Sequence, residues 1–171
     1  MKTTTRLLTT AAGLVLATGG LLAPTPLAAA ATPSCGNADL HASYHHSDSG
    51  MGHSYGWIVL RNTSGHACRT GGYGGISYVG HGDGTQIGHP AVREDEKAVR
   101  SFVLKAGQRL RSPLDEVTAL NYPRKTCHRA HVDGFRVYVP NATTSQYVVH
   151  PTVGCTNGHV HLLFQKPYRR P

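Results

Sequence analysis

The stretch IVLRNTSGHACRTGGYGGIS, residues 58–77, decides the fold of this chain. It opens as a strand in which Ile58 and Leu60 face the interior, because alternate side chains point to opposite sides of a strand. Residues 62–65, Asn-Thr-Ser-Gly, predict a turn, since short polar side chains hydrogen-bond to their own backbone. Cys68 then begins a returning strand, and the four glycines between residues 71 and 75 permit a sharp change of direction. The stretch therefore predicts the disulfide-bonded edge of a β-sandwich.

Short alternations of apolar and polar residues recur along the rest of the chain, separated by Gly, Asn, Asp and Pro. They fall at residues 39–45, 75–79, 99–112, 134–139 and 160–165, and Ala106-Gly107 divides the third of them into two strand-like pieces. In the last of them we expect Val160, Leu162 and Phe164 to share one buried face. Repeated short strands with turn residues between them are typical of an all-β, antiparallel β-sandwich.

Two Asp-Gly pairs and one charged segment complete the prediction of secondary structure. Asp83 and Asp133 each precede a glycine, and we assign both to turns. Only residues 93–99, REDEKAV, have helical character, and we expect a loop or a single turn there. The chain contains no internal repeat and no linker between domains.

The first thirty residues have the features of a secretory signal peptide. A lysine and an arginine lie among the first six residues, a mainly apolar stretch follows, and small residues come next. Ala28 and Ala30 satisfy the small-x-small rule for cleavage after Ala30. Glycine and threonine dilute the apolar stretch, and the flank of Cys35 is unlike that of a lipid-modified cysteine, so we expect no membrane anchor. The sequence predicts a signal peptide at 1–30, a single domain at 31–171, and a secreted, extracellular protein.

The predicted domain holds the chain's four cysteines, Cys35, Cys68, Cys127 and Cys155. An even number of cysteines in an exported chain indicates two disulfides, and the sequence alone allows three pairings. No two cysteines are spaced as CxxC, which excludes a zinc ribbon and a thioredoxin-type redox site.

Three ordered segments of the chain resemble the domain-of-unknown-function 4232 family, whose members are secreted or lipid-anchored bacterial proteins. The segments are LRNTSGHACRTGGYGGIS (60–77), ALNYPRKTCHRAHVDGFRVYVPNATTS (119–145) and VGCTNGHVHLLFQKP (153–167). The resemblance implies an Ig-like β-sandwich with two disulfides and no known catalytic residues. The order of these signatures, with the local loop that each bridge closes, predicts the pairs Cys35–Cys68 and Cys127–Cys155. Gly74 and the segment LKAGQ at 104–108 stand where the family favours proline-containing turns.

No catalytic motif is visible, and we expect neither an enzyme nor a bound cofactor. Residues 75–79, GISYV, lack the second glycine of a nucleophile elbow, and the chain has no HExxH motif. The glycine-rich stretch lacks the Lys-Ser/Thr pair of a nucleotide-binding loop. A secreted hydrolase is the third alternative, because a catalytic triad is recognised by geometry that spacing does not show.

Twelve histidines make metal binding the second alternative. His45, His46 and His53 crowd one early stretch, and His159 and His161 lie two apart on an expected strand, so that both rings would share a face. Imidazole is a common metal ligand but requires converging partners, and no carboxylate or cysteine lies at ligand spacing beside either group. We therefore interpret these histidines as surface residues and assign no metal site.

The charge of the chain favours an acidic partner. The formal net charge of the chain is +8. Residues 31–171 carry +6, because Lys2 and Arg6 lie in the first thirty residues whereas all nine acidic residues lie after them. The candidate contacts for a polyanion are Arg109, Arg111, Arg124, Lys125 and Arg129. A basic exported domain is attracted to anionic surfaces, whereas nucleic acid is not expected in that compartment. The sequence predicts a secreted, non-catalytic binding module for anionic cell-wall polymers or another extracellular protein.

Overall fold

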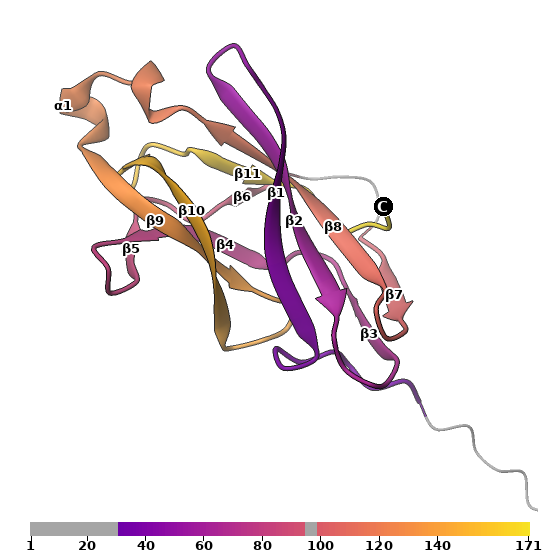
Figure 1. The fold of residues 1–171 in the computed structure, drawn as a ribbon. Coiled ribbons are helices and arrows are strands. Elements are labelled where there is room, and N and C mark those ends of the chain that lie inside the picture. The colour runs from indigo at the N-terminus through magenta and orange to yellow at the C-terminus, as the bar shows by residue number, and fades with distance from the viewer. Residues whose placement is uncertain (1–30, 95–98) are drawn as a thin grey trace, which may run out of the picture. The chain divides into compact units, whose positions relative to one another are not determined.

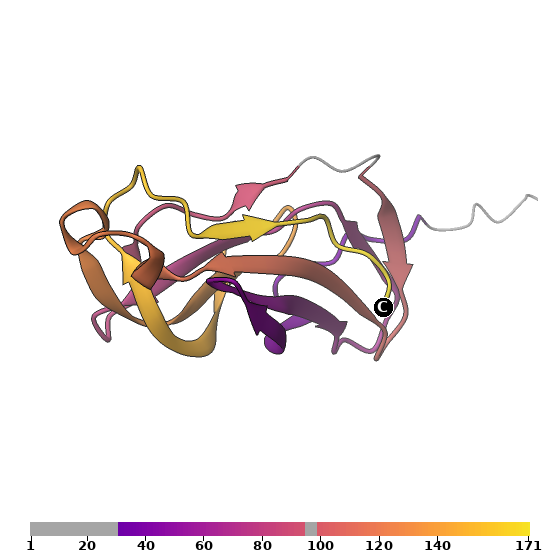
Figure 2. The same ribbon diagram turned by 90° about the horizontal axis from the view of Figure 1, so that it is seen from above.

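Two β-sheets enclose one core in the computed structural model, which describes residues 31–94 and 99–171 (Figure 1). The five-stranded sheet has the order β1-β2-β8-β11-β6, and Figure 2 shows β11 between β6 and β8. Its strands are β1 (Leu40–Gly50), β2 (His53–Asn62), β8 (Arg109–Val117), β11 (Leu163–Gln165) and β6 (Val92–Arg93). The strands are antiparallel except for the parallel pair β11 and β6.

A four-stranded antiparallel sheet, of order β10-β9-β4-β5, forms the other layer. Its strands are β10 (Ser145–Cys155), β9 (Arg129–Tyr138), β4 (Gly75–Gly80) and β5 (Thr85–Ile87). A separate pair consists of β3 (Cys68–Gly71) and β7 (Ser101–Leu104), and two short helical turns, η1 (Ala119–Asn121) and α1 (Arg124–Cys127), follow β8. The expected all-β antiparallel fold is confirmed.

Alternation along the strands builds the core. Ile58 and Leu60 of β2 are fully buried, as predicted, and pair with Ser112 and Leu110 of β8. Phe135 of β9, in the other sheet, belongs to the same buried hydrophobic cluster as these two side chains. Burying such large apolar side chains stabilises the fold by about 1.5–3 kcal/mol each.

The turn that follows β2 is anchored by a buried asparagine. Asn62 is fully buried, and its amide nitrogen donates to the carbonyls of His66 and Leu104, each at 2.9 Å. Its side-chain oxygen accepts from the backbone N–H of Ser64 at 2.9 Å. The predicted side-chain-capped turn is therefore present, and the same side chain ties β2 to β7.

Both disulfides join the predicted partners. Cys35 is bonded to Cys68 at the start of β3, and Cys127 at the end of α1 is bonded to Cys155 at the end of β10. All four cysteines are buried. Neither bridge connects the two large sheets, so each one fixes a peripheral segment to the sandwich.

For the last strand, the prediction of which residues face the core is wrong. Leu163 and Gln165 of β11 are buried and Phe164 is only half-buried, whereas Val160 and Leu162 lie buried in the loop before the strand. The alternation failed because an irregular loop, whose residues need not alternate, lies between residues 155 and 163. His159 and His161 are therefore loop residues and not a pair on one strand face.

Asp133 is also placed differently from the prediction. It lies inside β9, which continues through Asp133 because this strand pairs with both β4 and β10. Its carboxylate accepts from the backbone N–H of Gly82 at 2.8 Å and so closes the neighbouring hairpin. Asp83 does lie in that hairpin turn and accepts from the N–H of Thr85 at 2.8 Å.

The remaining predictions concern residues 93–99 and the first thirty residues of the chain. Arg93 of the segment 93–99 belongs to β6, while residues 95–98 and the predicted signal peptide 1–30 with its cleavage site lie outside the described residues. Neither η1 nor α1 was predicted. Residues 31–171 form one compact unit. In the part of the chain that is described, no helix is long and apolar enough to cross a membrane.

Candidate functional site

Two arginines flank a tryptophan on the outer face of the five-stranded sheet. The guanidinium carbon of Arg111 lies 4.1 Å from the centre of the Trp57 ring, and that of Arg169 lies 5.4 Å from it. Cations over an indole ring are attracted by its quadrupole, so the ring holds both charges in place. We call the surface formed by Trp57, Arg109, Arg111, Arg169 and His45 the Trp57 face.

The strand register explains how this surface forms. Arg109 and Arg111 are alternate residues of β8 and point outward, opposite Arg61 and Val59 of β2. The chain end runs along the other side of β8, because Arg111 and Arg169 exchange backbone hydrogen bonds of 2.8 and 2.9 Å. Residues from three separate segments are thus brought to one surface.

Trp57 forms a ridge between two shallow grooves. A groove of about 220 Å³ is lined by His45, Trp57, Val59, Arg109, Arg111 and Pro171. The other, of about 420 Å³, adjoins Arg169 and Lys166 but also Asp115 and Glu94. The first groove is the more basic because no carboxylate side chain lines it.

The arginines of the Trp57 face are not neutralised by the protein itself. Within residues 31–94 and 99–171, every side-chain ion pair recorded between a cation and a carboxylate uses a histidine, and none uses Arg109, Arg111 or Arg169. These guanidinium groups can therefore donate to an external anion at their exposed N–H groups.

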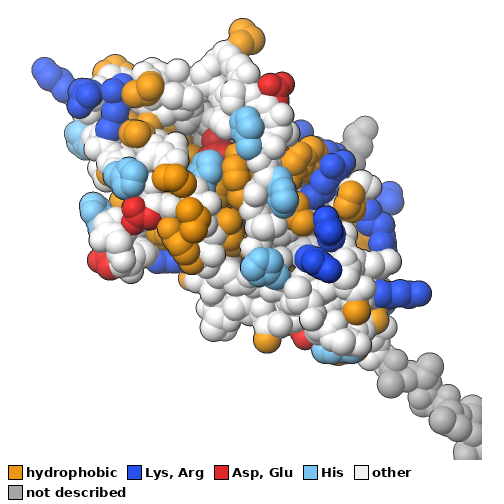
Figure 3. Space-filling view, in the orientation of Figure 1, with side chains coloured by type: hydrophobic (Ala, Val, Ile, Leu, Met, Phe, Trp, Pro, Cys, Tyr) orange, Lys and Arg blue, Asp and Glu red, His pale blue; other side chains and the backbone are white. Residues whose placement is uncertain are grey.

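The predicted basic residues do not form a single surface. Arg124 and Lys125 lie exposed on α1, which follows the C-terminal end of β8, whereas Arg109 and Arg111 lie at its N-terminal end. Figure 3 shows Lys and Arg side chains at the upper left, where α1 lies, and others well apart from them along the right side of the view. Arg129 is engaged internally, because its guanidinium donates to the carbonyl of Tyr122 at 2.9 Å. The structure thus brings together Arg109 and Arg111 and separates them from the other three.

The candidate metal-binding histidines are dispersed. His53 pairs with Asp115 at 2.8 Å, while His45 and His46 contact the hydroxyls of Ser43 and Ser54 at 3.2 and 3.4 Å. The ring of His161 lies 4.2 Å from that of His89, and His159 is exposed in a turn. Among the described residues, no group of three or more His, Cys, Asp or Glu side chains could hold a metal ion.

A buried carboxylate forms a second site that the sequence reasoning missed. Glu116 lies on the inner face of β8 with its side chain only 4% exposed. It accepts hydrogen bonds from the hydroxyls of Tyr44 at 2.7 Å and Tyr78 at 2.6 Å, and from Nε2 of His150 at 2.9 Å. A carboxylate in the interior requires such partners, because desolvation of a charge is costly.

The two tyrosines of this cluster are held in their neutral form. Burial, followed by the hydrogen bond to Glu116, raises the pKa of Tyr44, and burial, followed by the charge of Glu116, raises that of Tyr78. Both phenols therefore remain donors to the carboxylate. His150 is oriented by packing, because its ring stacks on Phe135 with centres 4.5 Å apart.

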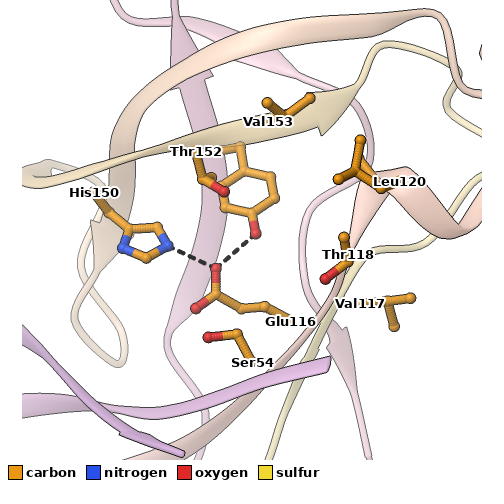
Figure 4. A pocket seen from close by; sticks show the side chains of 10 residues that line it. Ser54, Glu116, Val117, Thr118, Leu120, His150, Thr152 and Val153 are labelled. Carbon is orange, nitrogen blue, oxygen red and sulfur yellow. Dashed lines mark hydrogen bonds and ion pairs between the residues drawn. The ribbon is translucent and has the colours of Figure 1, made fainter. Parts of the chain in front are cut away.

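A pocket of about 250 Å³ opens beside the Glu116 cluster (Figure 4). Its lining combines Glu116 and His150 with the hydroxyl residues Ser54, Thr118 and Thr152 and an apolar rim that includes Leu120 and Val153. His150 lies in an irregularity of β10 between Val149 and Thr152, and such bulges re-aim side chains. Glu116 lies two residues after the inward-facing Leu114. Because alternate residues of a strand share a face, this spacing could have predicted that Glu116 is buried.

The pocket brings serine, histidine and a carboxylate together without forming a triad. His150 uses Nε2 for Glu116, and in the described part of the chain no hydrogen bond links Ser54 to His150. A serine nucleophile requires a base within hydrogen-bond reach. The histidine that contacts Ser54 is His46, at 3.4 Å, and His150 is engaged with Glu116, so Ser54, His150 and Glu116 do not form one relay.

The comparisons with known proteins identify a family and nothing more specific. No curated protein and no solved structure matches the chain. The model of the family described as "Domain of unknown function (DUF4232)" matches residues 35–163, which include all four bridged cysteines, Trp57, Arg109, Arg111 and the Glu116 cluster. Because this match covers most of the chain and every strand from β1 to β10, the protein belongs to the DUF4232 family.

Proposed function

We propose that this protein is a secreted, non-catalytic binding module that holds an anionic cell-wall polymer on its Trp57 face. The observation that carries the proposal is the placement of Arg111 and Arg169 over Trp57, at 4.1 and 5.4 Å, with no carboxylate partner. Guanidinium groups match the geometry of phosphate and carboxylate oxygens and bind them through paired hydrogen bonds.

The open form of the surface supports a polymer as ligand. Both grooves beside Trp57 are shallow, and the sheet face continues past them to Arg61 on β2. An extended chain of anionic groups can lie across such a face and contact several arginines at once. The net charge of +6 over residues 31–171 attracts the polymer from a distance, and salt screens this attraction.

Export is part of the proposal and is supported by two features. The small residues Ala28 and Ala30 follow an apolar stretch, as at a signal-peptidase site. The two disulfides are of the kind that persists in oxidising compartments outside the cytosol.

The test compares two double variants that remove the same charge from different places. Arg111→Ser with Arg169→Ser removes two charges from the Trp57 face, and Arg124→Ser with Lys125→Ser removes two from α1. On isolated anionic cell wall at low salt, we expect the first variant to bind about tenfold more weakly, from the loss of charge-assisted hydrogen bonds. The second variant should bind almost as well as the unaltered protein. Arg109 is exposed, and Arg109→Ser removes one charge from the same surface while Arg111 and Arg169 stay over the Trp57 ring.

Salt and chelator separate this proposal from its alternatives. Retention should fall steeply with rising salt and should not change with a chelator, because the interaction is one of charge. Binding that survives molar salt and disappears with chelator, or on changing His159 and His161 to Ala, would instead favour metal binding. Equal loss in both double variants would show that only the overall charge matters and would refute the Trp57 face as the site.

A further inference from the structure

The pocket beside Glu116 differs in charge from the surface of the rest of the molecule. Residues 31–171 carry a net charge of +6, yet among the described residues no lysine or arginine lines this pocket. Its ionisable lining residues are Glu116, His150 and the neutral Tyr78. Arg129 donates to the carbonyls of Leu120 and Tyr122 and is not part of the lining. The local charge therefore selects against anions, in contrast to the Trp57 face.

One hydrogen-bond acceptor position of the Glu116 carboxylate is unoccupied by the protein's described residues. A carboxylate offers about four lone-pair positions, two on each oxygen. Oε2 accepts from Tyr78 and His150, whereas Oε1 accepts from Tyr44 alone. Figure 4 shows the oxygen that carries no drawn bond on the side of Ser54, which also lines the pocket. One position on Oε1 thus remains for a donor from a ligand.

All three internal partners of Glu116 are donors, which fixes the chemistry of that position. Tyr44 and Tyr78 have raised pKa values and keep their protons, and His150 presents the N–H of Nε2. The carboxylate therefore meets three donors and acts as the acceptor for each of them. Within the described residues the recorded ion-pair partner of Glu116 is His150, with no lysine or arginine, so a cationic donor from a ligand suits the open acceptor position.

The remaining lining limits the size and shape of the ligand. The pocket volume of about 250 Å³ lies below the ~300–1,000 Å³ range of pockets for drug-sized ligands. Leu120 and Val153 at the rim are 63% and 42% exposed and can cover an apolar portion. The hydroxyls of Ser54, Thr118 and Thr152 supply further hydrogen bonds.

We propose that this pocket is a binding site for a small organic amine, whose ammonium group donates to Oε1 of Glu116 while its carbon chain lies against Leu120 and Val153. The site is separate from the Trp57 face and takes a ligand of opposite charge. His150, Tyr44 and Tyr78 act as positioning residues, because their hydrogen bonds hold the carboxylate in place.

The experiment uses three probes that share one carbon skeleton. Butylamine, butanol and butyrate are titrated separately into the isotope-labelled disulfide-bonded protein, and NMR shifts of the Leu120, Val153 and Val117 methyl groups are followed. We expect butylamine to bind at least about tenfold more tightly than the other two, because only it forms a charge-assisted hydrogen bond. Butyrate binding as well as butylamine would overturn the proposal, as would butylamine shifts confined to other parts of the molecule.

Variants at the rim keep the test independent of folding. Leu120→Lys places a competing cation at the mouth of the pocket, and Leu120→Gln is its neutral control at the same exposed position. Butylamine should bind several-fold more weakly to the first than to the second, and Glu116→Gln should abolish its preference over butanol. Equal binding to both Leu120 variants would refute the role of charge. Retention of Leu120→Gln on anionic cell wall should equal that of the unaltered protein, since this variant changes neither the Trp57 face nor the net charge.

Discussion

At the scale of single residues, Glu116 illustrates what a sequence can and cannot predict. Its burial follows from the alternation of β8, in which Leu110 and Leu114 also face inward. Its partners cannot be predicted in this way, because Tyr44, Tyr78 and His150 come from β1, β4 and β10. Contacts between distant segments depend on how the two sheets pack, and no local pattern encodes that packing.

The buried tyrosines lead to a prediction about alkaline pH. Their pKa values in the folded protein are raised above about 10, the value for an unfolded chain. The stabilisation they give is therefore fully present below about pH 10 and is lost as the pH rises above it, because only the unfolded chain then releases these protons. We expect the free energy of unfolding to fall above about pH 10, and to fall less steeply in Tyr78→Phe. Urea unfolding at a series of pH values measures both slopes.

An exposed tyrosine provides the control for this experiment. The side chain of Tyr147 is 57% exposed and donates to the carbonyl of Asp133. Tyr147→Phe should keep the alkaline slope of the unaltered protein. Identical slopes in Tyr78→Phe and the unaltered protein would mean that Tyr78 does not couple folding to proton release.

At the scale of strands and turns, the sequence is most informative where alternation is regular. Ile58 and Leu60 were placed correctly because β2 alternates without interruption up to the turn at residues 62–65. The phase of β11 was wrong because the loop that precedes this three-residue strand also contains buried apolar residues. In a long, regular strand such as β2, the alternation itself shows which residues face the core. A strand of three residues, such as β11, is too short to show this.

The glycine-rich stretch of the opening segment gives a prediction at this scale. Gly71 has a φ of +152°, and a Cβ atom there would lie 2.2 Å from the carbonyl oxygen of Arg100. Backbone cannot move aside as a side chain can, so the pairing of β3 with β7 would be disturbed. We expect Gly71→Ala to lower the free energy of unfolding by about 1–3 kcal/mol. Chemical denaturation of the purified protein measures the change.

Gly65, in the turn of the same segment, is the matched control. A Cβ atom at Gly65 would meet nothing within 4 Å, and its φ lies outside the left-handed region. Gly65→Ala should therefore leave stability nearly unchanged. A loss at Gly65 as large as that at Gly71 would contradict the explanation based on the close approach of Arg100.

At the scale of the whole molecule, the sequence indicated a basic protein but not where its charge gathers. Arg111 and Arg124 are separated by the remainder of β8 and by η1. The six residue-to-residue steps of strand from Arg111 to Val117 span about 20 Å at ~3.3 Å per step. Arg169 joins Arg111 only because the chain end returns along β8. Net charge is a property of composition, whereas a binding face is a property of topology.

Processing at the predicted signal peptide provides the last prediction. Small residues at Ala28 and Ala30 fit the peptidase site, so we expect the secreted chain to begin at Ala31, within two residues. Both disulfides should be formed, and intact mass should show the loss of residues 1–30 and of four hydrogens. Replacing Ala28 and Ala30 with Asp should block cleavage, because the peptidase pocket admits only small side chains. Recovery of the secreted protein with Met1 still attached would refute this assignment, since a signal peptide must be removed before the domain is released.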